Sequence, residues 1–261
     1  MSTFPPPLDM GVLPSSLDGG AARRAALGLV VLATDQTLEP EAAQLIRMPG
    51  VVPYVARLWN DADITPETLR AIQPRIAPAA DLILPGCKLD VVGFGCTSAT
   101  MVLGEEAVFA EIRKARPGVA CSTPITGALA AIAAFKARRV GLLTPYVAEI
   151  NLRIAAYFAG RGVHVTAMAT FDRRDDLEVA RIRVADIIDA ARRMSAQGGF
   201  DMLFVSCTSL RVAEAVAEIE AATGVPVTSS NHAMIWHMLR TAGVDDTVVD
   251  AGRLFTMGLA G

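Results

Sequence analysis

The chain has 261 residues, of which 52% are hydrophobic, 5% aromatic and 20% charged, and its formal net charge is −3 at pH 7. This length allows one large domain or two small ones, and the aliphatic composition favours α/β architecture over a disordered chain or an aromatic-rich β-sandwich. The acidic balance excludes the basic surface that nucleic-acid binding requires. No apolar stretch approaches the roughly 18 residues of a membrane span, so we expect no membrane partner.

The four cysteines are too few for a disulfide framework, and their spacing shows neither CxxC nor a Cys/His metal pattern. The first residues lack the basic start and apolar core of a signal peptide. We therefore expect a cytoplasmic protein with free thiols and no bound metal. Cys87 and Cys121 are interpreted as small buried hydrophobes.

Residues 1–26 are rich in Pro, Gly and Ser, which predicts an N-terminal arm outside the core. From Leu27 onward, short β-branched runs alternate with longer helical patterns. Strands are predicted at 27–33, 51–58, 90–95, 119–123, 139–145, 163–171, 201–207 and 226–230. Helices are predicted at 40–47, 66–80, 101–115, 128–136, 148–159, 179–196, 213–222 and 233–241. This alternation predicts parallel sheets with right-handed crossovers, and a ligand beyond the carboxyl ends of the strands.

An internal duplication is the most informative pattern. Cys96-Thr97-Ser98 recurs as Cys207-Thr208-Ser209, and an aspartate precedes each cysteine at the same spacing. We predict two similar flavodoxin-like parallel-sheet domains related by a pseudo-twofold axis. The first comprises residues 27–124 plus 231–261, and the second residues 125–230. Such an axis brings Cys96 and Cys207 to one cleft from opposite sides.

Each triplet follows a predicted strand and precedes a helical pattern, where unpaired backbone N–H groups and the helix dipole favour a thiolate. A thiolate is a strong nucleophile and proton acceptor. Nearby hydroxyls can hold a carboxylate or an enolate-like oxygen, and they are those of Thr97, Ser98, Thr208 and Ser209. The alternative is that the triplets recur only as helix caps.

Other polar residues lie at strand ends. Tyr146 can donate to a carboxylate or can serve as a packed ring. Asp35 and Gln36 end the first strand, where they can line the cleft or form a turn. Asn231 and His232 follow the last strand as polar lining or as a helix cap.

At these residues the chain resembles the aspartate/glutamate racemase superfamily, in the branch that contains maleate cis-trans isomerase and arylmalonate decarboxylase. The resemblance extends over about residues 27–255. Its markers are GCTSAT (95–100), LLTPY (142–146), SCTSLR (206–211) and PVTSSNHAMIWHMLRTAG (226–243). Four segments look most like the ectoine-utilisation subgroup, proposed to act in ectoine and hydroxyectoine breakdown: LATDQTLEPE (32–41), ILPG (83–86), CTSATMVLGEE (96–106) and SSNHAMIWHMLR (229–240).

The resemblance implies that Cys96 is the nucleophile that adds to the alkene in maleate isomerase, and that Cys207 handles the proton on the opposite face. It also implies that Tyr146 and the four hydroxyls of the triplets hold substrate carboxylates. Gln36 replaces a maleate-binding Asn of the family, and Asp175 or Asp176 replaces a later one. An aspartate repels a second carboxylate and attracts an amine, so we expect an amino or amido acid.

The predicted function is a cofactor-independent racemase or isomerase of a small carboxylic acid, in which one thiolate removes the α-proton and the opposite thiol returns one. No nucleotide-binding pattern appears. Maleate-type isomerisation and decarboxylation remain alternatives, although arylmalonate decarboxylase keeps only the second-half cysteine. A metabolite-binding protein without catalysis and a redox dithiol also stay open, as does a homo-oligomer.

Overall fold

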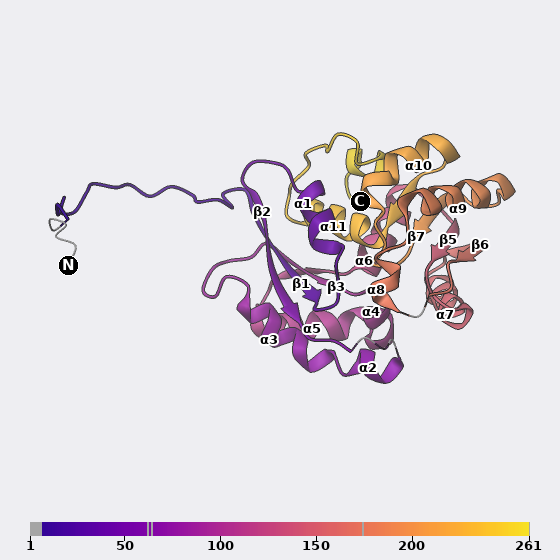
Figure 1. The fold of residues 1–261 in the computed structure, drawn as a ribbon, viewed down its shortest axis with the longest axis horizontal. Helices are drawn as coiled ribbons and strands as arrows, with labels where there is room; N and C mark the ends of the chain where they lie inside the picture. The colour runs from indigo at the N-terminus through magenta and orange to yellow at the C-terminus, as the bar shows by residue number, and fades with distance from the viewer. Residues whose placement is uncertain (1–6, 62, 64, 174, 261) are drawn as a thin grey trace, which may run out of the picture.

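The computed structural model describes residues 7–61, 63, 65–173 and 175–260 and contains two four-stranded parallel sheets (Figure 1). The first sheet has the order β2 (Val51–Leu58), β1 (Ala25–Leu32), β3 (Val91–Gly95) and β4 (Ala120–Ser122). The second has the order β6 (His164–Thr170), β5 (Arg139–Thr144), β7 (Met202–Val205) and β8 (Val227–Ser229). The two sheets repeat one strand order, so the predicted two-domain α/β fold is confirmed.

The helices follow the strands, as crossover connections require. In the first part of the chain they are α1 (Leu38–Leu45), α2 (Pro66–Arg70), α3 (Gln73–Leu82), α4 (Thr97–Leu103), α5 (Glu105–Ala115) and α6 (Pro124–Ala134). In the second they are α7 (Ala148–Ala159), α8 (Asp176–Val179), α9 (Val184–Gln197), α10 (Val216–Thr223) and α11 (Ser230–Thr241). Short 3-10 turns occur at Ala213–Ala215 and Arg253–Thr256. No helix among the described residues is long and apolar enough to cross a membrane.

Several predicted helices are divided or shifted. The one predicted at 66–80 is two helices, because Pro74 has no N–H to continue a helix and instead starts a new one. The one predicted at 101–115 begins earlier, at Thr97, and breaks at Gly104, whose φ is 88°. The 179–196 pattern forms α8 and α9. At the N-terminus, β1 begins two residues before the predicted strand, and residues 7–20 are exposed without helix or strand (Figure 1).

The strand β1 is buried on both faces, which explains its unbroken apolar sequence. Leu27, Leu29 and Val31 belong to a core cluster that continues through α11 into the second sheet. Val30 and Leu32 belong to a separate cluster under α3 and α5. The shared cluster packs the two halves against each other.

The last helix, α11, returns to the first half of the molecule. It packs against β3, β4 and α1, and Figure 1 shows it beside α1. It also packs against α6, where Gly127 approaches the backbone of Ala233. Helix α11, which follows β8 in the second sheet, therefore lies against the first sheet.

Candidate active site

The first triplet lies where a strand ends and a helix begins. Cys96 is the N-cap of α4, and its sulfur accepts a hydrogen bond from the Ala99 N–H at 3.4 Å. The Thr100 hydroxyl donates to the Cys96 carbonyl at 2.6 Å. The strand-to-helix position predicted for Cys96 is confirmed, and the cap holds its side chain at the carboxyl end of β3.

The second triplet does not start a helix, so the predicted position of Cys207 at a helix N-terminus is wrong. After β7 the chain forms an irregular loop up to the 3-10 turn at Ala213. The reason is a competing acceptor: the N–H groups of Val212 and Ala213 donate to the Glu41 carboxylate at 2.6 and 2.7 Å. The loop is thus held by α1 of the other half rather than by helical hydrogen bonds.

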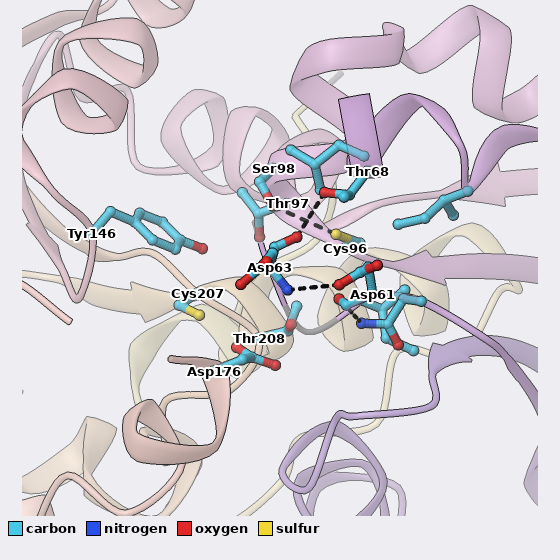
Figure 2. Close-up of a pocket in the computed structure, with 14 residues that line it drawn as sticks. Asp61, Asp63, Thr68, Cys96, Thr97, Ser98, Tyr146, Asp176, Cys207 and Thr208 are labelled. Atoms are coloured by element: carbon cyan, nitrogen blue, oxygen red, sulfur yellow. Dashed lines mark hydrogen bonds between the residues drawn. The ribbon is translucent and has the colours of Figure 1, made fainter. Parts of the chain in front are cut away.

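Both cysteines line one pocket, with residues of both halves around it (Figure 2). Seven of the ten residues predicted for the site are in its lining: Cys96, Thr97, Ser98, Tyr146, Asp176, Cys207 and Thr208. The free volume is about 30 Å³, so the pocket is narrow in this conformation. The arrangement brings the two thiols, three hydroxyls and a phenol together at the carboxyl ends of the two sheets.

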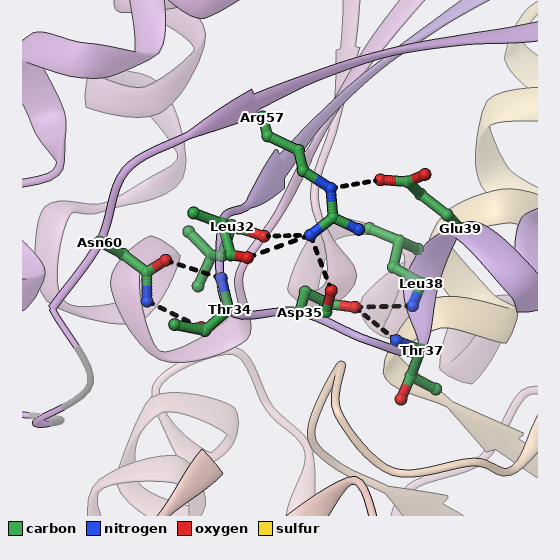
Figure 3. A network of polar contacts seen from close by, with 9 residues as sticks. Leu32, Thr34, Asp35, Thr37, Leu38, Glu39, Arg57 and Asn60 are labelled. Carbon is green, nitrogen blue, oxygen red and sulfur yellow. Dashed lines mark hydrogen bonds and ion pairs between the residues drawn. The ribbon is translucent and has the colours of Figure 1, made fainter. Parts of the chain in front are cut away.

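Three predicted residues do not line the pocket. The Ser209 hydroxyl lies outside the lining and donates a hydrogen bond to the lining residue Asp176 at 2.6 Å. Asp35 is buried and accepts from the N–H groups of Thr37 and Leu38 at 2.8 and 2.7 Å, which is the role of a turn residue before α1 (Figure 3). Gln36 is exposed, since this turn directs Asp35 inward and the next side chain outward.

Arg57 holds the loop after β1 in place (Figure 3). Its guanidinium donates to the carbonyls of Ala33 and Asp35 at 3.1 and 2.9 Å, and it forms an ion pair with Glu39 at 2.7 Å. This network keeps the loop turned towards β2 and explains why Gln36 stays outside the pocket.

Other lining residues come from the segment after β2 and were not predicted. Four of them are polar: Asn60, Asp61, Asp63 and Thr68. The Asp63 N–H donates to Asp61 at 3.1 Å, and the Thr68 hydroxyl donates to the Asp63 carbonyl at 2.6 Å. Their sequence signal is weak, namely an acidic run just past a strand end. Asp61, Asp63 and Asp176 together give the pocket three carboxylates.

The environment of the two sulfurs favours the neutral thiol. Burial raises the pKa of Cys96 to about 11. The hydrogen bond from the Ala99 N–H lowers this pKa, but by less than burial raises it. Burial, together with the nearby Asp176 carboxylate, raises the pKa of Cys207 to about 12. Desolvation therefore outweighs the local hydrogen bonds and favours the neutral thiol over the predicted thiolate at both cysteines of the free protein.

Two further side chains bear on Cys207. The Tyr146 hydroxyl lies near its sulfur and lowers the pKa of the thiol. Burial raises the pKa of Tyr146 itself well above its usual value, so the phenol remains a proton donor. Asp176 accepts from Ser209 and also from Thr34 at 3.3 Å, and burial raises the pKa of this carboxyl group.

Asn231 and His232 lie inside the protein rather than in the pocket lining. Asn231 donates to Glu41 at 2.8 Å and to the Thr208 carbonyl at 2.7 Å. His232 contacts the Thr228 hydroxyl at 2.8 Å and the Ala251 carbonyl at 2.7 Å, and burial lowers its pKa to about 4. Asn231 thus supports the loop that carries Cys207.

The remaining cysteines are separate from the pocket. Cys121 is buried, as predicted, but Cys87 is exposed in a turn after α3 and is not a buried hydrophobe. Within the described parts of the chain, no group of three His, Cys, Asp or Glu side chains is placed to hold a metal ion.

A family model described as arylmalonate decarboxylase matches residues 27–255. The chain belongs to this family. Over 214 residues it is 30% identical to the arylmalonate decarboxylase of Bordetella bronchiseptica, covering 78% of this chain and 88% of that protein. Over 243 residues it is 26% identical to the maleate isomerase of Pseudomonas putida, covering 88% and 96%.

Solved structures of family members have the same fold. The maleate cis-trans isomerase of Nocardia farcinica, bound to TRIS, matches with a TM-score of 0.78 at 25% identity, covering 89% of this chain and 98% of that one. The maleate isomerase of Pseudomonas putida S16 matches with a TM-score of 0.79 at 21% identity, with the same coverage. The resemblance inferred from the sequence is confirmed at the level of this family.

Proposed function

We propose that this family member is a cofactor-independent racemase or isomerase that uses Cys96 and Cys207 on a small carboxylic acid. The observation that carries the proposal is that the two thiols line one pocket from opposite halves of the molecule. A carbon atom held between them is accessible to a sulfur on each face. Proton removal on one face and delivery on the other inverts that carbon.

In the racemase reaction, one sulfur acts as a thiolate and takes the proton from the α-carbon. The electron pair of the broken C–H bond moves towards the carboxylate, and the hydroxyls of Thr97, Ser98 and Thr208 stabilise the enolate-like oxygens. The opposite thiol then gives its proton to the other face of the carbon. The two sulfurs have exchanged protonation states, so their titration belongs to the pair.

Because the pKa values of both thiols are raised, an additional interaction must favour the thiolate form of one cysteine when the substrate is bound. A substrate ammonium group beside the sulfurs does so, because opposite charges within a few ångströms favour the charged form. Asp61, Asp63 and Asp176 supply the matching negative charge for such a group. We therefore propose an amino or amido acid over a plain dicarboxylate, and, from the sequence resemblance, an amino acid derived from ectoine or hydroxyectoine.

Maleate-type isomerisation is the second candidate. It is supported by the relatives in Pseudomonas putida and Nocardia farcinica, which are named maleate isomerases. In this reaction the Cys96 sulfur adds to the alkene, the central bond rotates, and elimination of the sulfur restores a trans alkene. Decarboxylation is less well supported, since the sequence resemblance associates it with the second-half cysteine alone and this chain retains both.

A metabolite-binding protein without catalysis does not need two matched thiols. The proposal also includes a cytoplasmic location, which agrees with four free cysteines, and leaves association into a homo-oligomer as a prediction.

Deuterium uptake tests the proposal. Candidate amino acids and maleate are incubated with the enzyme in D₂O, and incorporation at the α-carbon and product configuration are followed by NMR. We expect uptake with inversion, lost in both Cys96→Ser and Cys207→Ser. Cys121→Ser, which replaces a buried thiol outside the pocket, is the matched control and retains activity. Uptake that survives Cys96→Ser contradicts the two-thiol reaction, and a stable adduct on one cysteine with an unsaturated diacid favours isomerisation of an alkene.

A further inference from the structure

A second, much larger cavity adjoins the thiol pocket. It has a volume of about 650 Å³, against about 30 Å³ for the pocket itself. Leu69, Thr97, Ser98 and Tyr146 line both, so the two spaces share a wall. Cavities of about 300–1,000 Å³ are typical of small-molecule sites. A substrate larger than a few atoms has room to extend from the narrow thiol pocket into this space.

The lining of this cavity is mostly apolar. Met101 and Val102 of α4 lie on one side, and Ile150 and Ile154 of α7 on another, with Leu69 of α2 completing it. Met101, Val102 and Ile150 are only partly buried, although they are apolar side chains next to a reactive centre. Covering them with an apolar group removes their surface from water and is favourable.

The charged side chains at the cavity have partners within the protein. Arg153 pairs with Glu149 at 2.8 Å, and Arg70 lies 3.7 Å from Glu67. Tyr157 donates to Glu105 at 2.8 Å. Arg70 and Arg153 thus each have an opposite charge nearby, and the apolar side chains make up most of the lining that remains for a ligand. A neutral apolar chain is complementary to them.

We propose that this cavity binds an apolar substituent of the substrate, an alkyl or acyl chain several carbons long, while the carboxylate and the reacting carbon lie between the thiols. This assignment of substrate class rests on the proposed function. It places the reacting carbon in the narrow pocket and the remainder of the molecule between α2, α4 and α7.

Alkylation of the thiols tests the cavity without requiring turnover. A 2-bromoalkanoate carries a carboxylate, a reactive α-carbon and a chain; a cysteine sulfur displaces bromide, a C–S bond forms as the C–Br bond breaks, and the thiol proton goes to buffer. Labelling of Cys96 and Cys207 by 2-bromopropanoate and by 2-bromooctanoate is measured by mass spectrometry. Each rate is divided by the rate of the same reagent with N-acetylcysteine. We expect the longer reagent to react at least about tenfold faster on this scale, since each buried methylene adds to binding.

Two variants on α7 locate the effect. Ile150→Trp fills the cavity, and the ratio of long-chain to short-chain labelling is expected to fall towards one. Leu152→Trp adds the same side chain on the outer face of the helix, where Leu152 is 61% exposed, and keeps the ratio. A ratio near one in the unmodified protein, or equal ratios in the two variants, overturns the cavity assignment.

The outcomes separate the two proposals. If the enzyme inverts short carboxylic acids but shows no chain-length preference, the function stands and the cavity assignment fails. If chain-length preference is present and no carboxylic acid is turned over, the cavity is a binding site and the catalytic proposal fails.

Discussion

The hydroxyl of Ser230 lies 3.0 Å from the hydroxyl of Thr97 and connects the two cysteine triplets. The same Ser230 oxygen accepts a hydrogen bond from the Cys207 N–H at 3.0 Å. All three groups are buried. Ser230, at the start of α11, thus fixes the backbone of Cys207 relative to Thr97, the residue that follows Cys96.

Replacing this bridge is expected to lower both stability and activity. Ser230→Ala leaves the Cys207 N–H and the Thr97 hydroxyl without their shared partner, which costs about 1–3 kcal/mol of unfolding free energy. We expect kcat/KM to fall at least about tenfold, because the Cys207 backbone is no longer held, as loss of about 1.4 kcal/mol of transition-state stabilisation would produce. Denaturant unfolding and steady-state kinetics measure the two effects.

The matched control for that change is Ser195→Ala. The Ser195 hydroxyl is buried and has no hydrogen-bond partner among the described residues, so its removal is expected to leave stability and kcat/KM nearly unchanged. If Ser230→Ala behaves like Ser195→Ala, the bridge does not position Cys207.

Thiol reactivity is expected to depend steeply on pH. With the pKa of Cys96 near 11 and that of Cys207 near 12, labelling of both by iodoacetamide should keep rising between about pH 7 and pH 10 without a plateau. Tyr146→Phe removes the hydroxyl that lowers the Cys207 pKa, so Cys207 should label more slowly in that variant at each pH. Peptide mass spectrometry resolves the sites, with exposed Cys87 as the internal reference.

A plateau below about pH 9 in the labelling of Cys96 and Cys207 would show that the free protein already holds thiolates. Equal slowing of Cys87 in Tyr146→Phe would point to a general effect of the substitution rather than to the contact with Cys207.

We expect the free energy of unfolding to depend on pH through the ionisation of Glu41. Burial raises its pKa from 4.5 to about 7, so the folded state binds this proton more tightly than the unfolded state does. The resulting stabilisation is complete below about pH 4.5 and is lost as the pH rises through about 7. The unfolding free energy of the native protein, minus that of Glu41→Gln, should therefore fall by an amount on the order of 3 kcal/mol from about pH 4.5 to pH 8.

Denaturant unfolding at several pH values provides this difference and cancels the titration of other groups, such as His232. Glu214→Gln, which removes a carboxyl group from an exposed site on the adjacent 3-10 turn, is the control for the substitution itself. A flat difference for Glu41→Gln would mean that its carboxyl group ionises equally in both states.

The contact between α6 and α11 predicts a strong effect at Gly127. A Cβ atom there would lie 2.5 Å from the backbone carbon and oxygen of Ala233, so Gly127→Ala must separate the helices. We expect a loss of about 1–3 kcal/mol or more and a lower Tm. Gly160→Ala, whose nearest atom would be 3.6 Å away, should be neutral or slightly stabilising in the same thermal unfolding experiment. Equal Tm values for the two variants would contradict the close packing.

The α/β class, the duplication and the pairing of the two cysteines that line the pocket could be predicted from the sequence alone. These are encoded locally: alternating strand and helix patterns, and one triplet repeated after equivalent strands, require no knowledge of distant contacts. The same reasoning placed Cys96 correctly at a helix start, because its cap is made by Ala99 only three residues away.

The way in which the site is completed depends on contacts between segments that are far apart in the chain. Glu41 and Asn231 are 190 positions apart, yet their contact helps hold the loop that carries Cys207 and explains why no helix begins there. Gln36 points outward because Arg57, on another strand, anchors its loop. The raised pKa values of the two thiols follow from burial, which depends on both halves closing over one pocket. Such contacts arise from packing between segments remote in the chain, so no local pattern in the sequence reports them.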